Sequence, residues 1–310
     1  MRSPIRICRA ALALATVAVL GLTARGLAQS DTPRETAVEL DVVALGNDER
    51  PVTGLTQNDF SVKEDGRAVK VTTFTEVSAA GISGRQDARV VSLLLDDNSV
   101  PLNATTIMQN IARLFVSFAR PSDVISAVRL THRDDEAAGG LPLTLETIDA
   151  YRAGTLGFFG RTMADTAMQT VARVSRQLEP IEHRRKALIC IGRREVCDPF
   201  FEVPETSLLW NSWRDAITRT ARANASVYVV SPEGVTSRMD LGGGLVDTTG
   251  GGVFVRSNDF ERSARMIWDE SSHYYLLGYT PTSTSRTLHK IDVSVHRRGV
   301  HLRARKERGD

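Results

Sequence analysis

The feature that most constrains this fold is an alternation of buried-strand and amphipathic-helix patterns through the middle of the chain. Val90–Leu95 is a nearly continuous apolar run, which is typical of a strand covered on both faces. Apolar residues then recur at helical spacing from Ile107 to Phe118, and Pro121 ends that helix. The alternation continues with a strand at 124–130, a weaker and possibly edge strand at 141–148, a helix from Met163 to Leu178, a strand at 187–191, a helix from Trp210 to Ala221, a strand at 227–230 and a helix at 260–268 begun by Asn258 or Asp259. This order predicts an α/β fold with a mostly parallel, doubly wound sheet and right-handed crossovers, over residues 88–271.

The two chain ends have a different, period-two pattern. Residues 36–77 contain short alternating runs and the dipeptide Asp65-Gly66, which favours a tight hairpin. Residues 272–310 contain a strand candidate at 274–277 and two alternating runs separated by Arg298-Gly299. Because so few strands cannot bury a core alone, we expect both ends to combine in one small β-sandwich-like module, with 78–87 as a linker.

The first residues have the pattern of a secretory signal peptide. Three arginines precede an apolar run from Ala10 to Leu22, and the small-residue end Gly26-Leu27-Ala28 follows. The run is shorter than the ~20 apolar residues that a membrane span needs; the alternative is a retained anchor helix. We therefore expect residues 1–28 to be removed and the protein to be exported, to the periplasm or the medium, without membrane insertion after removal.

Charge and cysteine content agree with that expectation. Without the four arginines of residues 1–28, 35 basic face 37 acidic residues, so the mature chain has no basic excess with which to bind nucleic acid. Its only cysteines are Cys190 and Cys197. In an oxidising compartment the simplest pairing is one disulfide closing a small loop, and the alternative is two free thiols with Cys190 packed in a strand.

The arginine- and lysine-rich chain end from Arg297 to Arg308 has two interpretations. One is a phosphate-binding patch. The other, which we prefer, is the solvated face of a strand followed by a tail.

Candidate chemistry is concentrated at Asp96-Asp97-Asn98-Ser99, which follows the first central strand. Ligand sites in parallel sheets lie beyond the carboxyl ends of the strands. Acids there suit a hard cation, a phosphoryl acceptor or a hydrolase nucleophile. No suitable Asp ends the strand near residue 190, no Lys follows Val230, and no nucleophile elbow, zinc-binding His-Glu-x-x-His or phosphate loop occurs. The sequence therefore favours a protein that is not an enzyme, with a hydrolase that uses Asp96 or Asp97 as the alternative.

Several motifs together resemble the VWFA-related proteins abundant in acidobacteria, a branch of the von Willebrand factor A domain family. They are a strand ending in Asp96, Gly160-Arg161-Thr162 opening a helix, the run Arg50–Phe60 with Glu64-Asp65-Gly66, Thr249–Gly252, the run Tyr274–Pro281 and Val300–Lys306. The resemblance covers nearly the whole mature chain. It implies a Rossmann-like A domain, an exported adhesion-type or adaptor-type binding protein and a protein partner, and no established catalytic activity.

The resemblance also implies a metal-ion-dependent adhesion site, from which this sequence departs. The family pattern is Asp-x-Ser-x-Ser, a Thr on a second loop and an Asp on a third. Asp96 and Thr162 keep their places, Asn98 replaces the first Ser and Val100 the second. Ile191-Gly192 stands where the third-loop Asp is expected, and Asp198 is displaced from it. Asp96, Asn98 and Thr162 form a thin ligand set for Mg²⁺ or Mn²⁺, so we expect a degenerate site, with no cofactor as the preferred interpretation.

Taken together, these features predict an exported binding protein whose A domain presents a partner-binding face near the loops after residues 96, 160 and 191. A structural envelope component is a further alternative.

Overall fold

The computed structural model describes residues 38–78, 88–135, 140–154, 160–182, 184–199, 207–233, 244–254, 259–282 and 288–308. The expected signal peptide, and most of the expected linker, lie outside these ranges.

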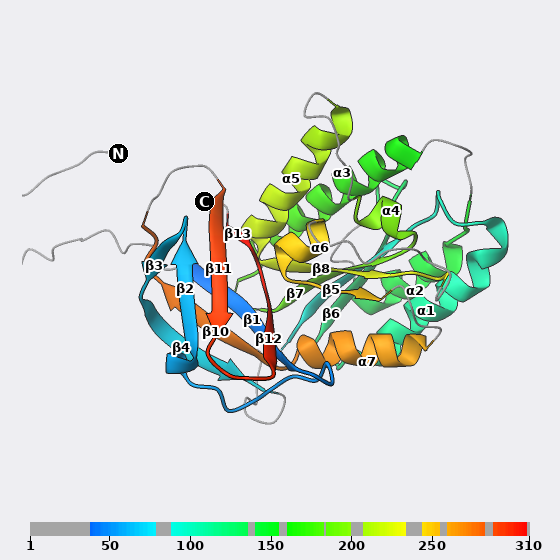
Figure 1. Cartoon of the computed structure of the whole chain (residues 1–310). Coiled ribbons are helices and arrows are strands. Elements are labelled where there is room, and N and C mark those ends of the chain that lie inside the picture. The colour runs from blue at the N-terminus through cyan, green and yellow to red at the C-terminus, as the bar shows by residue number, and fades with distance from the viewer. Residues whose placement is uncertain are drawn as a thin grey trace, which may run out of the picture. The chain divides into compact units, whose positions relative to one another are not determined.

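The middle of the chain forms the predicted α/β fold. Its five-stranded sheet has the order β6-β5-β7-β8-β9, and every neighbouring pair is parallel. The strands are β5 (Val90–Leu95), β6 (Val124–Arg129), β7 (Lys186–Ile191), β8 (Ala225–Val230) and β9 (Val253–Phe254). Helices cover both faces (Figure 1), so the prediction of a doubly wound parallel sheet is confirmed.

Alternate side chains of each central strand enter two separate cores. Leu94 and Cys190 face a core with the helices α3 (Gly160–Leu178), α4 (Arg194–Cys197), α5 (Leu208–Ala223) and α6 (Leu245–Thr249). Leu93 and Ile189 face the other core, with α1 (Thr105–Ser117) and α7 (Phe260–Glu270). Burial on both faces explains why these strands read as continuous apolar runs. The N-cap of α7 is Asp259, whose carboxylate accepts a hydrogen bond from the Arg262 amide at 2.9 Å.

One expected strand is a helix. Residues 141–148, predicted as a weak edge strand, lie in α2 (Gly140–Ala150). Leu141, Leu143 and Leu145 alternate as in a strand, but these leucines are exposed. The helix instead buries Thr144, Thr147 and Ile148, and Thr144 Oγ1 donates to the Ile125 carbonyl of β6 at 2.8 Å. The helix thereby covers a strand edge that would otherwise present unpaired backbone groups.

Strands from the two chain ends form two antiparallel sheets. One has the order β12-β1-β10-β4 and the other β13-β11-β2-β3. Leu40, Phe60, Tyr275 and Ile291, which come from both sheets, share one buried core. The strands are β1 (Val38–Gly46), β2 (Phe60–Glu64), β3 (Arg67–Val69), β4 (Val71–Val77), β10 (Tyr274–Tyr279), β11 (His289–Val295), β12 (Val300–Ala304) and β13 (Glu307–Arg308). We call these strands the β module.

The preferred interpretation of the basic chain end is wrong for three of its arginines. Arg305 and Arg308 are buried, and the Arg303 side chain is only 21% exposed. Arg303 bonds to Glu270 and Arg308 to Glu64. Arg305 instead donates to the Ala221 carbonyl at 2.6 Å and to the Asn224 side-chain oxygen. The burial of Arg303 and Arg308 is tolerable because each is paired with a buried carboxylate, and that of Arg305 because it is hydrogen-bonded.

Candidate functional site

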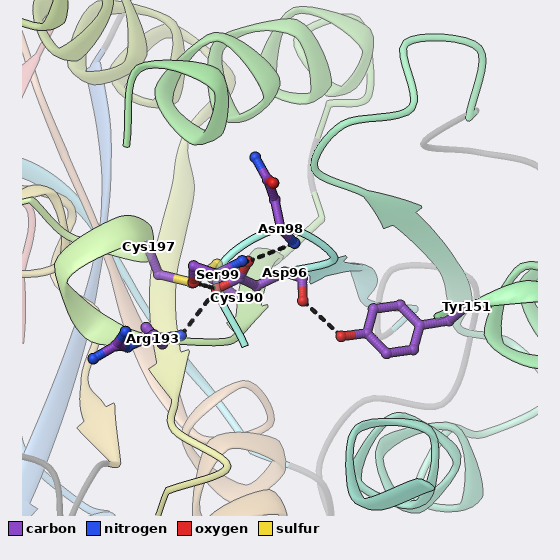
Figure 2. Close-up of a disulfide and its surroundings, with 7 residues drawn as sticks. All are labelled: Asp96, Asn98, Ser99, Tyr151, Cys190, Arg193 and Cys197. Atoms are coloured by element: carbon purple, nitrogen blue, oxygen red, sulfur yellow. Dashed lines mark hydrogen bonds between the residues drawn. A yellow bond between two sulfur atoms is a disulfide. The ribbon is translucent and has the colours of Figure 1, made fainter. Parts of the chain in front are cut away.

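Asp96 lies at the carboxyl edge of the parallel sheet, directly after β5, and is fully buried. Its Oδ1 accepts hydrogen bonds from the amides of Asn98 at 3.2 Å and Ser99 at 2.9 Å. Its Oδ2 accepts from the Ser99 hydroxyl and from the Arg193 amide at 3.1 Å. Figure 2 shows these donors arranged around the carboxylate. Both oxygens are therefore committed to protein donors, one of which belongs to the loop after β7.

The electrostatics of Asp96 are a balance between burial and hydrogen bonding. Burial raises the pKa of this carboxyl, and the bonds from Ser99, Arg193 and Asn98 oppose the rise. The main chain of Gly192 passes against the same side chain, because a Cβ placed there would collide with Asp96 Cβ. The glycine that follows β7 is thus the residue type that lets the two loops meet.

The predicted disulfide is confirmed. Cys190, near the end of β7, is bonded to Cys197 at the end of α4, with a Cα–Cα distance of 5.8 Å. Both cysteines are fully buried. The bridge closes the loop that contains Gly192 and Arg193, so it fixes the segment that caps Asp96 (Figure 2).

Tyr151 supports the β5 loop from the opposite side. Its hydroxyl donates to the Asp96 carbonyl oxygen at 2.6 Å, and the side chain is fully buried. Burial, with the nearby charges of Asp96 and Asp97, raises the pKa of this phenol far above its usual value, so it remains a donor. The residue carries no sequence motif, and sequence reasoning missed it.

The other two proposed metal ligands, Asn98 and Thr162, have unlike environments. Thr162 is exposed in the first turn of α3, where its carbonyl accepts a bond from Thr166 Oγ1 at 3.0 Å. Asn98 Oδ1 is buried without a hydrogen-bond partner among the described residues, and Val100 is fully buried. A Mg²⁺ ion needs several accessible oxygens in octahedral geometry. A buried carboxylate with four protein donors, an exposed threonine and an apolar valine do not fit that requirement.

Asp198 has a different role from that of a third-loop ligand. It is 2% exposed, and it accepts a hydrogen bond from the Val246 amide at 3.4 Å in the first turn of α6. Burial raises the pKa of Asp198, and the amides of Val246 and Leu245 together with Arg194 oppose the rise. Gly244 adjoins the carboxylate so closely that a Cβ there would overlap it. Asp198 therefore caps α6.

Asp97 belongs to a separate polar cluster. It accepts from the Thr131 amide at 3.1 Å and the Thr131 hydroxyl at 2.5 Å, and its Oδ2 lies 3.0 Å from His132 Nδ1. The Asp97 side chain is 4% exposed and that of His132 is 48% exposed. The carboxylate thus holds the imidazole by one nitrogen at the surface of the carboxyl edge.

The glycine motif 249–252 packs against the chain segment 304–306. Gly250 has φ +72°, and a Cβ there would lie 2.5 Å from the carbonyl carbon of Ala304. The Lys306 amide donates to the Thr248 carbonyl at 2.8 Å. The motifs Thr249–Gly252 and Val300–Lys306, which are far apart in the sequence, therefore meet as two halves of one contact.

A buried ionic network also joins the β module to the base of the parallel sheet, and sequence reasoning missed it. Arg185 Nη1 donates to Asp41 Oδ2 at 2.8 Å, with both side chains below 5% exposed. The Tyr228 hydroxyl donates to Glu270 Oε2 at 3.3 Å, and Arg303 Nη1 donates to Glu270 Oε1 at 2.5 Å. Burial raises the pKa of Tyr228 to about 12. The β module is therefore tied to the α/β part by paired charges as well as by glycine packing.

Among the residues that the structure describes, no group of three or more His, Cys, Asp or Glu side chains is placed to hold a metal ion. None of the helices that the structure describes is both long and apolar enough to cross a bilayer.

Comparisons with known proteins add little. No family model and no curated protein matches this chain. Among solved structures, the chain is similar to the crystal structure of the manganese-loaded TRAP protein of Plasmodium vivax, at 10% identity and a TM-score of 0.35, over 76% of this chain and 96% of that one. We draw no conclusion about this chain from that likeness.

Proposed function

We propose that this chain is an exported, non-enzymatic binding protein of the VWFA-related type. Its partner-binding face is formed by the loops at the carboxyl edge of the parallel sheet, after β5, β6 and β7, and its partner is another protein. Three properties support this proposal: the parallel sheet that presents those loops, the anchoring of the loops to one another, and the motifs of the two chain ends.

The observation that carries the proposal is the fixed geometry of the β5 and β7 loops. Asp96 joins the two loops through the Arg193 amide, and the Cys190–Cys197 bridge closes the second loop. Loops held in one conformation lose little conformational entropy on binding, so a preorganised surface binds a partner more tightly. Exposed polar side chains stand on this face: the Arg193 side chain is 44% exposed and that of His132 is 48% exposed.

Recognition by this face is proposed to be independent of metal. In adhesion sites of the kind that the resemblance implies, a cation would connect the site to an acidic group of the partner. Here the Asp96 carboxylate is enclosed by protein donors. The side chains on the loop surfaces, among them Arg193, would supply the contacts instead.

Export remains part of the proposal. The Cys190–Cys197 disulfide is consistent with an oxidising compartment. If export occurs as proposed, the full chain expressed in an exporting host loses residues 1–28, and mass spectrometry of the mature protein gives an N-terminus at Gln29.

The binding face is tested by site-specific photo-crosslinking of the exported protein in its native envelope. Crosslinkers placed at His132 and Arg193 probe the face, and crosslinkers at the exposed positions Lys63 and Asp292 of the β module are matched controls. We expect adducts with a distinct protein from the face alone, unchanged by a chelator. Adducts only between copies of this chain would favour a structural envelope component. Adducts from the control positions alone would contradict the assigned face.

A hydrolase remains the second candidate, and the Asp97–His132 contact is the observation that favours it. A buried carboxylate that orients an exposed imidazole is an arrangement suited to general-base chemistry. Generic ester, phosphate and glycoside substrates test it with wild-type protein and with the variants Asp97→Asn and His132→Gln. Turnover that both substitutions abolish would establish an enzyme, and turnover unchanged by either would not come from this cluster.

A further inference from the structure

The junction around Asp96 has one connection between loops that the disulfide directly stabilises. The amides of Asn98 and Ser99 bind Asp96 from within its own loop. The Arg193 amide, 3.1 Å from Oδ2, comes from the loop closed by Cys190 and Cys197. This amide stands in the part of the junction where the family pattern would have a third-loop acid.

We infer that the Cys190–Cys197 disulfide controls access to Asp96. In the oxidised protein the bridged loop holds the Arg193 amide on the carboxylate and excludes water and cations. In the reduced protein the loop moves away and the carboxylate becomes accessible. A dithiol reductant supplies the two electrons and two protons that convert the bridge into two thiols, and is itself oxidised to a disulfide.

The packing of Gly192 shows why a small displacement of the loop is sufficient to expose Asp96. Its backbone adjoins the Asp96 side chain with no space for a Cβ, so the loop covers the carboxylate directly. Besides the bridge, this loop is held by the partly exposed ion pair of Arg193 Nε with Glu233 Oε1 at 3.4 Å and by the buried Val196 side chain. It is also held by hydrogen bonds, such as the one from the Gly192 amide to the Val230 carbonyl at 3.0 Å and the one from the Cys197 amide to the Arg193 carbonyl at 2.9 Å. Each such hydrogen bond contributes only about 0.5–1.5 kcal/mol to stability, and an exposed ion pair about 0–1 kcal/mol. The covalent bridge is therefore the strongest single restraint on the loop that covers Asp96.

Amide hydrogen exchange of the full mature protein tests this control. We compare oxidised wild type with the variant Cys190→Ala/Cys197→Ala and with wild type reduced by a dithiol. The Arg193 amide is expected to exchange roughly tenfold faster or more without the bridge, because local opening sets its protection. The Val91 amide, in the middle of the sheet, is expected to stay protected, which shows that the fold persists. Equal Arg193 exchange in all three samples would overturn the inference.

Line broadening by Mn²⁺ alone provides a second readout. The Ser99 and Arg193 amides are expected to be unaffected by Mn²⁺ in oxidised wild type and broadened after reduction, and Asp96→Asn in the reduced protein should remove the broadening. Gly192→Ala displaces the loop that covers Asp96 while the bridge is intact, and should reproduce the broadening in oxidised protein. Gly154→Ala, next to the Asp97 carbonyl, is the matched glycine control. Broadening in oxidised wild type, or none after reduction, would contradict the inference. These readouts do not involve the partner, so they are independent of the proposed function.

Discussion

Arg185 and Asp41 form an ion pair inside the protein, with Nη1 and Oδ2 2.8 Å apart and the two side chains 3% and 4% exposed. Asp41 belongs to β1 of the β module, and Arg185 directly precedes β7 of the parallel sheet. The guanidinium also lies over the Tyr274 ring, 5.4 Å from its centroid. Two parts of the fold that are 144 residues apart in the chain are therefore joined by desolvated charges.

Removing one partner of this pair should be strongly destabilising. Asp41→Ala leaves the Arg185 guanidinium buried without its carboxylate, at an expected cost of about 3–5 kcal/mol in the free energy of unfolding. Urea unfolding measures the change. The control is Asp48→Ala, whose side chain is 65% exposed in a loose surface pair with Arg50, and it should change stability by less than about 1 kcal/mol. Equal effects of the two substitutions would show that the buried pair does not join the parts as described.

The contact between the glycine motif and the chain end predicts a contrast between two glycines. Gly250 and Gly54 have nearly the same positive φ, +72° and +73°, but only Gly250 adjoins other atoms that a Cβ would meet. Both Gly→Ala changes therefore cost about 1–2 kcal/mol for the left-handed backbone. Gly250→Ala should lose about 1–3 kcal/mol more by collision with Ala304. Thermal unfolding of the two variants measures the difference, and equal losses would contradict the close approach.

The buried ammonium of Lys186 leads us to expect that the free energy of unfolding rises at alkaline pH. Its ammonium is buried and donates to the Ala223 carbonyl at 2.6 Å, and burial lowers its pKa from 10.5 to about 8. Between these two values the unfolded chain binds more protons than the folded one, so the free energy of unfolding increases with pH. The expected gain from pH 7.5 to 9.5 is about 2 kcal/mol.

Urea unfolding across that range checks the prediction for Lys186. The variant Lys186→Met removes the titrating group while keeping much of the side-chain volume, and its stability should be flat from pH 7.5 to 9.5. A wild-type stability that falls over this range would contradict the lowered pKa.

The disulfide should stabilise the folded state modestly, because the loop it closes is short. Cys190 and Cys197 are separated by 7 positions. Closing so short a loop lowers the entropy of the unfolded chain by an amount that stabilises the folded state by only about 2.5 kcal/mol. Cys190→Ala/Cys197→Ala should therefore lose about that amount, plus the cost of the removed sulfur packing, and still fold. Non-reducing mass mapping of wild type must show the bridge, and denaturant unfolding of the variant measures the loss.

The local sequence pattern was sufficient for most of the secondary structure. Runs such as Val90–Leu95 and the helical spacing from Ile107 to Phe118 report burial along one element, and the parallel sheet follows from their order. The strand prediction for residues 141–148 is wrong because three leucines at alternate positions mimic a strand. The helix instead buries Thr144, which donates a hydrogen bond to the Ile125 carbonyl of β6. A local pattern does not show which neighbour an element must satisfy.

The position of the candidate site could be predicted from the sequence, but the hydrogen bonds that enclose its carboxylate could not. Asp96 follows a predicted buried strand, and strand ends place ligand sites, so its position was predictable. That its carboxylate is closed by the Arg193 amide depends on a contact between residues 97 positions apart. The contribution of Tyr151, which reaches Asp96 from 55 positions away, likewise has no local signature.

What the sequence by itself determined is most of the elements, their order and the two cysteines available to pair, because hydrophobic period and residue type act over a few neighbouring positions. Only the tertiary structure decided which charges are buried together and which oxygens are already bonded. The partners of Asp41, Arg305 and Asp96 come from distant parts of the chain. A buried charged or polar group must have a partner, because desolvation without one is costly. Which two groups become partners depends on the tertiary fold, which brings distant parts of the chain together.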